Sequence, residues 1–127
     1  MAFTLSLVEQ VTNGGDTIKQ EQIFSNTYRK SVDESIATGQ TDYLVSFELT
    51  VAKCVAIFVK SDQDVTLETN SGSSPTNTIA LKANIPYVWY TNKYDSLKFT
   101  SDVTKIYITN ASGSTARLQI EALVDAT

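Results

Sequence analysis

The sequence predicts an all-β fold: a single domain over residues 1–127 built as an antiparallel, jelly-roll-like β-sandwich of about eight to ten short strands. Thr, Val, Ile, Phe, Tyr and Trp make up 49 of the 127 residues, and these types suit a pleated, half-buried surface. Apolar residues alternate with polar ones over short runs, and turn-forming residues separate these runs at intervals of roughly 8–14 residues. A chain of this length can bury one hydrophobic core without disulfides or metal.

The first strands are predicted from a two-residue alternation and a strong turn signal. Phe3, Leu5 and Leu7 are separated by polar residues, as in a strand with one face on a core. Residues 13–16 read Asn-Gly-Gly-Asp, a hairpin signal because Asn and Gly tolerate positive φ. The alternation continues for nine residues over 43–51, which predicts a strand there.

The segment from residue 21 to residue 36 is ambiguous. Phe24, Tyr28, Val32 and Ile36 are four residues apart, a spacing that suits one face of a helix. The intervening Thr and Ser residues are mediocre helix formers, however. Both a strand followed by a loop and a short helix stay open for this segment.

Residues 55–59, Val-Ala-Ile-Phe-Val, are apolar at every position. Such a strand is expected to be central in its sheet, or to have one face covered by another part of the chain or by a partner. Cys54 adjoins this run and is the single cysteine, so we expect a buried core residue and no disulfide. The remaining strands are predicted around residues 65–67, 79–81, 106–108 and 118–122.

Charge and composition exclude several classes of function. The chain has no histidine, which excludes histidine-based triads, bases and metal ligands. Its net charge of −4 and its lack of a lysine or arginine cluster argue against a nucleic-acid partner. The N-terminus has no basic segment followed by a long apolar one, and the apolar runs are too short to cross a bilayer. We therefore expect no nucleic-acid partner, no membrane contact, no cofactor and synthesis in a cytoplasm.

The acidic residues offer only weak catalytic or metal-binding candidates. Asp62 and Asp64 could begin a calcium loop, but residues 65–67 return to a strand pattern, so ordinary turn aspartates are favoured. Facing glutamates in a sandwich groove could hydrolyse glycosides, although solvated strand faces explain them more simply. The glutamates in question are Glu48, Glu68 and Glu121. We predict no catalytic residue, no metal site and no enzymatic activity.

An aromatic cluster at residues 87–94 is the feature most suggestive of function. In a strand, Tyr87 and Trp89 face one way while Tyr90 faces the other, so one face must expose aromatic surface or be covered. Three interpretations stay open, namely core packing, a subunit or partner contact, and a platform for sugar stacking. The candidate interface residues are Trp89, Tyr90 and Tyr94 in this cluster, together with Phe3 near the N-terminus.

The C-terminal third carries a resemblance to a known group of proteins. The segments at residues 85–90 (IPYVWY), 101–113 (SDVTKIYITNASG) and 116–125 (ARLQIEALVD) form a strand, an Asn-x-Ser-Gly turn and a further strand. This arrangement resembles the small β-sandwich virion proteins of tailed bacteriophages, in particular the capsid decoration or cement proteins. The resemblance covers roughly 40 residues and has no shared site signature, so it transfers no functional residue.

That resemblance implies a structural virion protein that binds the outside of a phage capsid and stabilises contacts between major capsid protein subunits. Its expected partners are the major capsid protein and further copies of itself, as a dimer or trimer. Its expected location is the capsid exterior. The alternative is a carbohydrate-binding or adhesion module of a phage tail or surface protein.

Overall fold

The computed structural model describes residues 3–26 and 28–125. Within these residues the fold is all-β with antiparallel strand pairs, as predicted, and contains ten strands and no α-helix. A 3₁₀ turn, Val51–Lys53, is the other regular element of the described chain. The strands are β1 (Phe3–Asn13), β2 (Asp16–Asn26), β3 (Tyr28–Ile36), β4 (Tyr43–Val45), β5 (Cys54–Ser61), β6 (Val65–Thr69), β7 (Thr78–Leu81), β8 (Tyr87–Tyr90), β9 (Ile106–Thr109) and β10 (Ala116–Val124).

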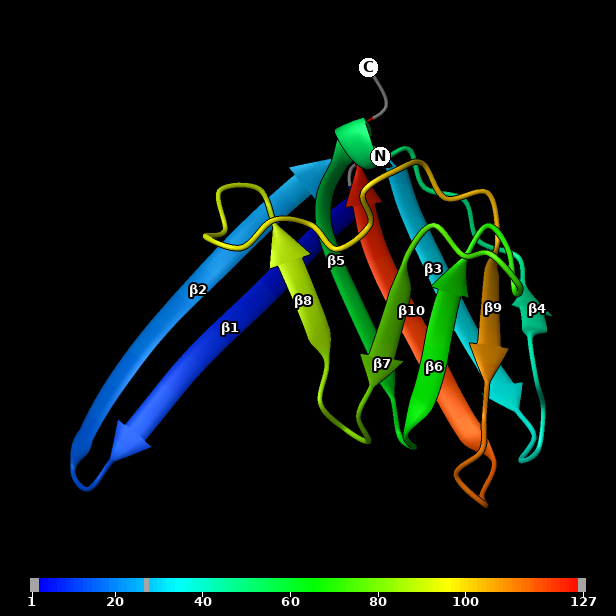
Figure 1. The fold of residues 1–127 in the computed structure, drawn as a ribbon. Helices are drawn as coiled ribbons and strands as arrows, with labels where there is room; N and C mark the ends of the chain where they lie inside the picture. Colours follow the sequence, from blue (N-terminus) through cyan, green and yellow to red (C-terminus); the bar gives the residue numbers. More distant parts are fainter. Residues whose placement is uncertain (1–2, 27, 126–127) are drawn as a thin grey trace.

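Eight of these strands form two facing four-stranded sheets (Figure 1). One sheet has the order β3-β10-β5-β8 and the other β4-β9-β6-β7. The core lies between them and takes Ile57 and Ile120 from the first sheet and Leu67 and Ile108 from the second, all four almost fully buried. Alternation along each strand turns every second side chain into this layer, so the polar residues between them face outward.

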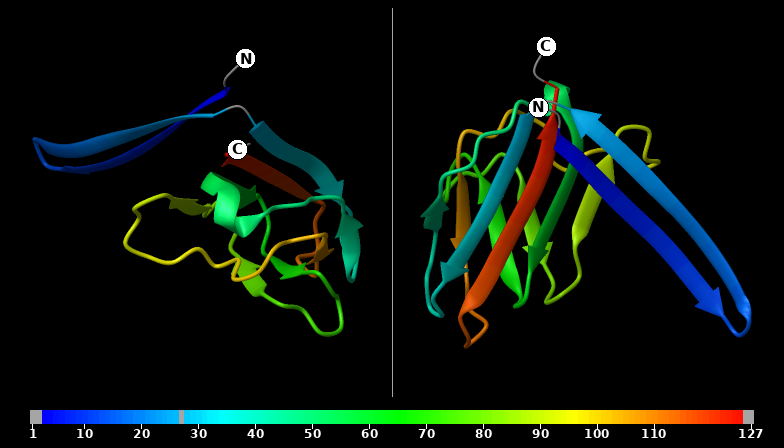
Figure 2. Two further views of the ribbon diagram at one scale, coloured as in Figure 1. Left: turned by 90° about the horizontal axis from the view of Figure 1, so that it is seen from above. Right: turned by 180° about the vertical axis from the view of Figure 1, so that it is seen from behind.

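The first two strands form a separate two-stranded ribbon, which we call the arm (residues 3–26). Its strands pair along their whole length, from Phe3 opposite Asn26 to Asn13 opposite Asp16. The predicted hairpin is confirmed, with Gly14 at a φ of 63° in the turn, a conformation that glycine adopts without strain. The arm crosses the outer face of the β3-β10-β5-β8 sheet and projects past β8 (Figures 1 and 2).

Residues 21–36 contain no helix in their described part, so the helical interpretation of this segment is wrong. Phe24 lies in β2, whereas Tyr28, Val32 and Ile36 lie in β3. Side chains four apart share a face of a strand as well as of a helix, because four is a multiple of the two-residue strand repeat. The spacing alone therefore could not distinguish the two structures.

Of two further strand predictions, one is confirmed and the other is wrong in part. The apolar run at residues 55–59 lies in β5, which is central between β10 and β8, as predicted. The expected strand over residues 43–51 is wrong beyond Val45, because only β4 pairs with β9 and a single bridge joins Leu49 to Val103. Val45, Phe47 and Leu49 nevertheless stay buried, so the alternation reports burial even where the ladder stops.

Candidate functional site

The arm packs against its own sandwich along its base, by which we mean residues 3–9 and the residues paired with them. Leu123 of β10 lies outside the core cluster between the two sheets, yet it is only 2% exposed. Phe3 and Leu5 of the arm lie beside it on the outer face of the sheet. Leu7 of the arm is itself 8% exposed. This second apolar contact, on the outer face of the sheet, holds the arm in place.

The row of outer-face residues at this contact can be followed across the sheet. Leu123 lies outside the core cluster between the two sheets and is paired with Ala56 of β5, which in turn is paired with Tyr90 of β8. The Tyr90 ring packs against Phe24 of the arm with a centroid separation of 5.6 Å. Its hydroxyl donates a 2.8 Å hydrogen bond to the Glu9 carboxylate, and this bond raises the pKa of Tyr90. The base of the arm is thus held by apolar packing and by one polar contact.

An open groove of about 440 Å³ runs between β1 and the strands β5 and β8. Its walls are mainly apolar. They include Leu5, Leu7 and Val8 from the arm, and Phe58, Val88 and Tyr90 from the sheet. The groove therefore offers an apolar surface beside the arm that the chain itself does not fill.

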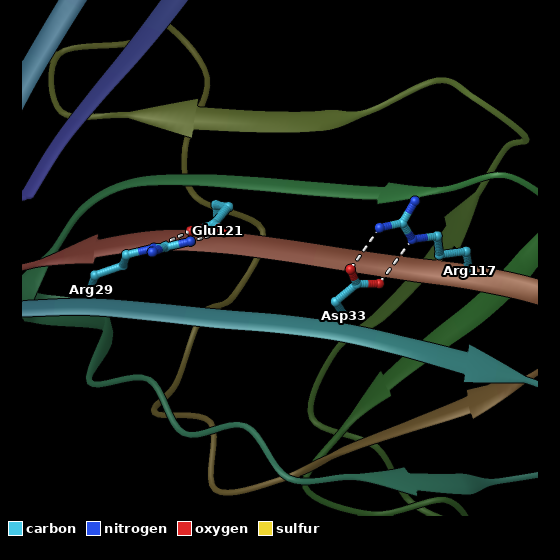
Figure 3. A network of polar contacts seen from close by, with 4 residues as sticks. All are labelled: Arg29, Asp33, Arg117 and Glu121. Carbon is cyan, nitrogen blue, oxygen red and sulfur yellow. Dashed lines mark hydrogen bonds and ion pairs between the residues drawn. The ribbon is translucent and has the colours of Figure 1, made fainter.

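Two bidentate ion pairs tie β3 to β10 on the same outer face (Figure 3). The Arg29 guanidinium donates to both carboxylate oxygens of Glu121 at 2.8 and 2.6 Å. Arg117 donates to both carboxylate oxygens of Asp33 at 2.9 and 2.7 Å, and this hydrogen bonding lowers the pKa of Asp33. Glu121 also borders the groove. Its carboxylate is already paired there with Arg29.

The arm leaves apolar side chains exposed on both of its faces. Val11 and Ile18 are cross-strand partners, and they are 64% and 77% exposed. Val8 and Ile23 are also exposed, and the alternation places them on the opposite face of the ribbon. A two-stranded ribbon is marginally stable on its own in water, and exposed apolar patches commonly mark interaction sites. The distal arm is therefore the leading candidate for a binding surface.

The structure separates the four predicted interface residues. Trp89 packs against the core, and its indole Nε1 donates a 2.9 Å hydrogen bond to the Asp95 carbonyl. Tyr90 and Phe3 both contact the region where the arm meets the sheet. Tyr94 is fully exposed in the loop after β8. The aromatic cluster is thus divided between the core, the base of the arm and an exposed loop.

Sequence reasoning missed the residues that define the arm. Val11, Ile18 and Leu123 were not singled out, although Val11 and Ile18 flank the predicted turn symmetrically. Pairing outward from that turn would have placed the two side chains opposite each other, because a two-residue turn fixes the register. Leu123 had no comparable signal, since its burial depends on where the arm lies.

The aspartates considered for a cation site accept hydrogen bonds from backbone N–H groups. Asp62 accepts a 2.8 Å hydrogen bond from the Arg117 N–H, and Asp64 accepts one of 2.8 Å from the Ala83 N–H. Over residues 3–26 and 28–125, no group of three acidic or cysteine side chains is placed to hold a metal ion.

Glu68 and Glu121, two of the three glutamates considered for glycoside hydrolysis, do not form a pair. Glu68 lies in β6 and Glu121 in β10, which belong to different sheets. Both alternate with core-facing residues, so they lie on opposite outer faces of the sandwich. The pKa of Glu68 is raised by desolvation and by the neighbouring Asp42.

Comparison of the chain with protein-family models, with curated proteins and with solved structures found no match. None of the helical structure in the described residues is long and apolar enough to span a membrane.

Proposed function

We propose that this chain is a structural virion protein that binds the outer surface of a phage capsid as a homo-oligomer and stabilises contacts between major capsid protein subunits. The observation that carries the proposal is the arm, a projecting ribbon with exposed apolar side chains on both faces. Proteins that act by assembly need such surfaces on a rigid scaffold, and repeated contacts raise their overall affinity.

The order of the strands also supports the proposal. From β3 to β10 the chain changes sheet at each connection except that between β6 and β7. We infer a jelly roll from this order, in which the first strand of the eight lies beside the last and the second beside the seventh. Jelly rolls recur among viral capsid domains, so the fold supports a virion role by analogy.

Tyr94 is the residue that we assign to the capsid contact. It is fully exposed in the loop after β8. The hydrogen bond from Trp89 to the carbonyl of Asp95, the residue next to Tyr94, fastens that loop to the sandwich. A large aromatic side chain on a fastened loop loses little conformational freedom on binding, which suits an interface anchor.

Co-sedimentation with undecorated phage heads tests the proposal. The wild-type protein is expected to sediment with the heads in a saturable manner. Tyr94→Ala is expected to weaken binding roughly 30-fold, the loss typical of an anchor residue, without changing the thermal midpoint. Tyr28→Ala is the matched control, because Tyr28 is exposed at the opposite edge strand, β3. Absence of wild-type protein from the pellet at saturating concentration would overturn the proposal.

A further inference from the structure

The arm has one face that is half covered and half exposed. Leu5, Leu7 and Glu9 face the sandwich, and the two-residue alternation places Val11 on the same face. Ile18 lies opposite Val11 on the neighbouring strand. The contact between arm and sheet therefore continues into an apolar pair that has no surface to cover it in the described chain.

The groove at the base of the arm is an apolar surface of the kind that would cover this exposed pair. Its walls include Leu7 of the arm and Phe58 and Val88 of the sheet, so it is apolar like the exposed pair. The tip cannot enter this groove in its own chain, because residues 5–9 of the same arm form one wall of the groove and the tip projects away from it (Figure 2).

We propose that Val11 and Ile18 of one chain insert into the groove of a second copy of this chain. The exposed pair and the groove occur on the same chain but cannot meet within it. Association of identical chains brings one chain's pair to another chain's groove. The groove accepts apolar side chains readily, because Glu121 on its border is paired with Arg29 and Glu9 is bonded to Tyr90. The inference takes from the proposed function only that the chain works as a homo-oligomer.

This contact can be repeated in two kinds of closed assembly. Two chains that exchange arms reciprocally make a closed dimer with two equivalent contacts, and three chains that pass their arms in one direction make a closed ring. In either case, the apolar ribbon is enclosed between copies and is no longer exposed to solvent.

The first test is the mass of the full chain in solution without heads. The wild-type mass is expected to be a small multiple of 13.9 kDa. Val11→Lys combined with Ile18→Lys is expected to weaken association at least 100-fold and to leave the thermal midpoint of the monomer unchanged, because both side chains are exposed within one chain. Thr12→Lys is the matched control, since Thr12 is adjacent to Val11 but on the other face of the arm.

The second test is a cross-link between two single variants, each with Cys54 replaced by Ala. Chains carrying Val11→Cys are mixed with tagged chains carrying Val88→Cys and are then oxidised. The expected product is the mixed disulfide, in excess over either symmetric disulfide. A wild-type mass of 13.9 kDa at about 100 μM, an unchanged mass in the lysine variant, or no preference for the mixed product would each overturn the inference.

The outcomes also separate this inference from the proposed function. An oligomer that does not sediment with heads would support arm exchange and contradict capsid binding. A monomer that does sediment with heads would contradict arm exchange and support capsid binding.

Discussion

Replacing Leu123 by Ala tests whether the arm is held by its own apolar contact, separate from the core. Leu123 is 2% exposed, yet it lies on the outer face of β10 under the arm. Leu→Ala changes at buried sites cost about 2–5 kcal/mol, and the cost is lowest where the surroundings can close the cavity. Because a two-stranded ribbon can shift toward the sheet, we expect the low end, about 2–3 kcal/mol.

This loss should appear as opening of the arm. The docked ribbon is stabilised by the sheet beneath it, and once undocked a ribbon of two strands pairs only marginally. Amide hydrogens of residues 5–7 and 22–24 are therefore expected to exchange roughly 30- to 150-fold faster, the factor that 2–3 kcal/mol represents. Exchange in the central strand β5 should change much less.

The matched control is Leu118→Ala in the same strand. Leu118 is fully buried on the inner face of β10, in the core between the sheets. Its replacement should lower the global free energy of unfolding by about 3–5 kcal/mol, measured by urea denaturation. If Leu123→Ala instead lowered the global stability by as much, with no selective exchange in the arm, the arm would belong to the same cooperative unit as the core. That result would refute the reasoning.

Three further predictions concern the sandwich. Asn110→Ala should lower the free energy of unfolding, measured in urea, by about 2–4 kcal/mol. The reason is that the fully buried Asn110 amide donates to the Ile36 carbonyl and accepts from the Ser112 N–H. A loss below about 0.5 kcal/mol would contradict this. Burial raises the pKa of Cys54 to about 12, above its value in the unfolded chain, so the stability it contributes is complete at pH 8 and is lost as the pH rises through the interval from about 9 to about 12. Cys54→Ala should show a shallower decline of stability over that interval, and labelling of the wild-type thiol at pH 8 should require unfolding. Asp33 has a lowered pKa, so its contribution is present at neutral pH and lost as the pH falls through that lowered value; the urea midpoints of Asp33→Asn and wild type should therefore converge in acid, and a constant difference between them would contradict this.

Much of the fold could be predicted from local patterns. The two-residue alternation located the strands because one face of each strand is buried, and residues 13–16 identified the hairpin because their turn chemistry is specific. The central position of β5 followed from its apolar residues on both faces. The end of β4 at Val45 could not be predicted, because the alternation reports burial and not the hydrogen bonds of a ladder.

The candidate site was less predictable, because it depends on long-range placement. Tyr90 and Phe24 are distant in sequence, and only the path of the arm across the sheet brings them together. The ion pair between Arg29 and Glu121 likewise depends on the register of β3 against β10. Local patterns contain neither the direction of the arm nor the pairing of these distant strands.

An image of phage heads after incubation with the protein tests the central claim most directly, namely that this chain acts by surface contact and assembly. We predict ordered density on the outside of the shell, with sandwich domains over junctions between capsid subunits and arms that join neighbouring copies. Smooth heads at saturating protein concentration would contradict that claim, and separate, unjoined sandwich domains on the shell would contradict the role assigned to the arm.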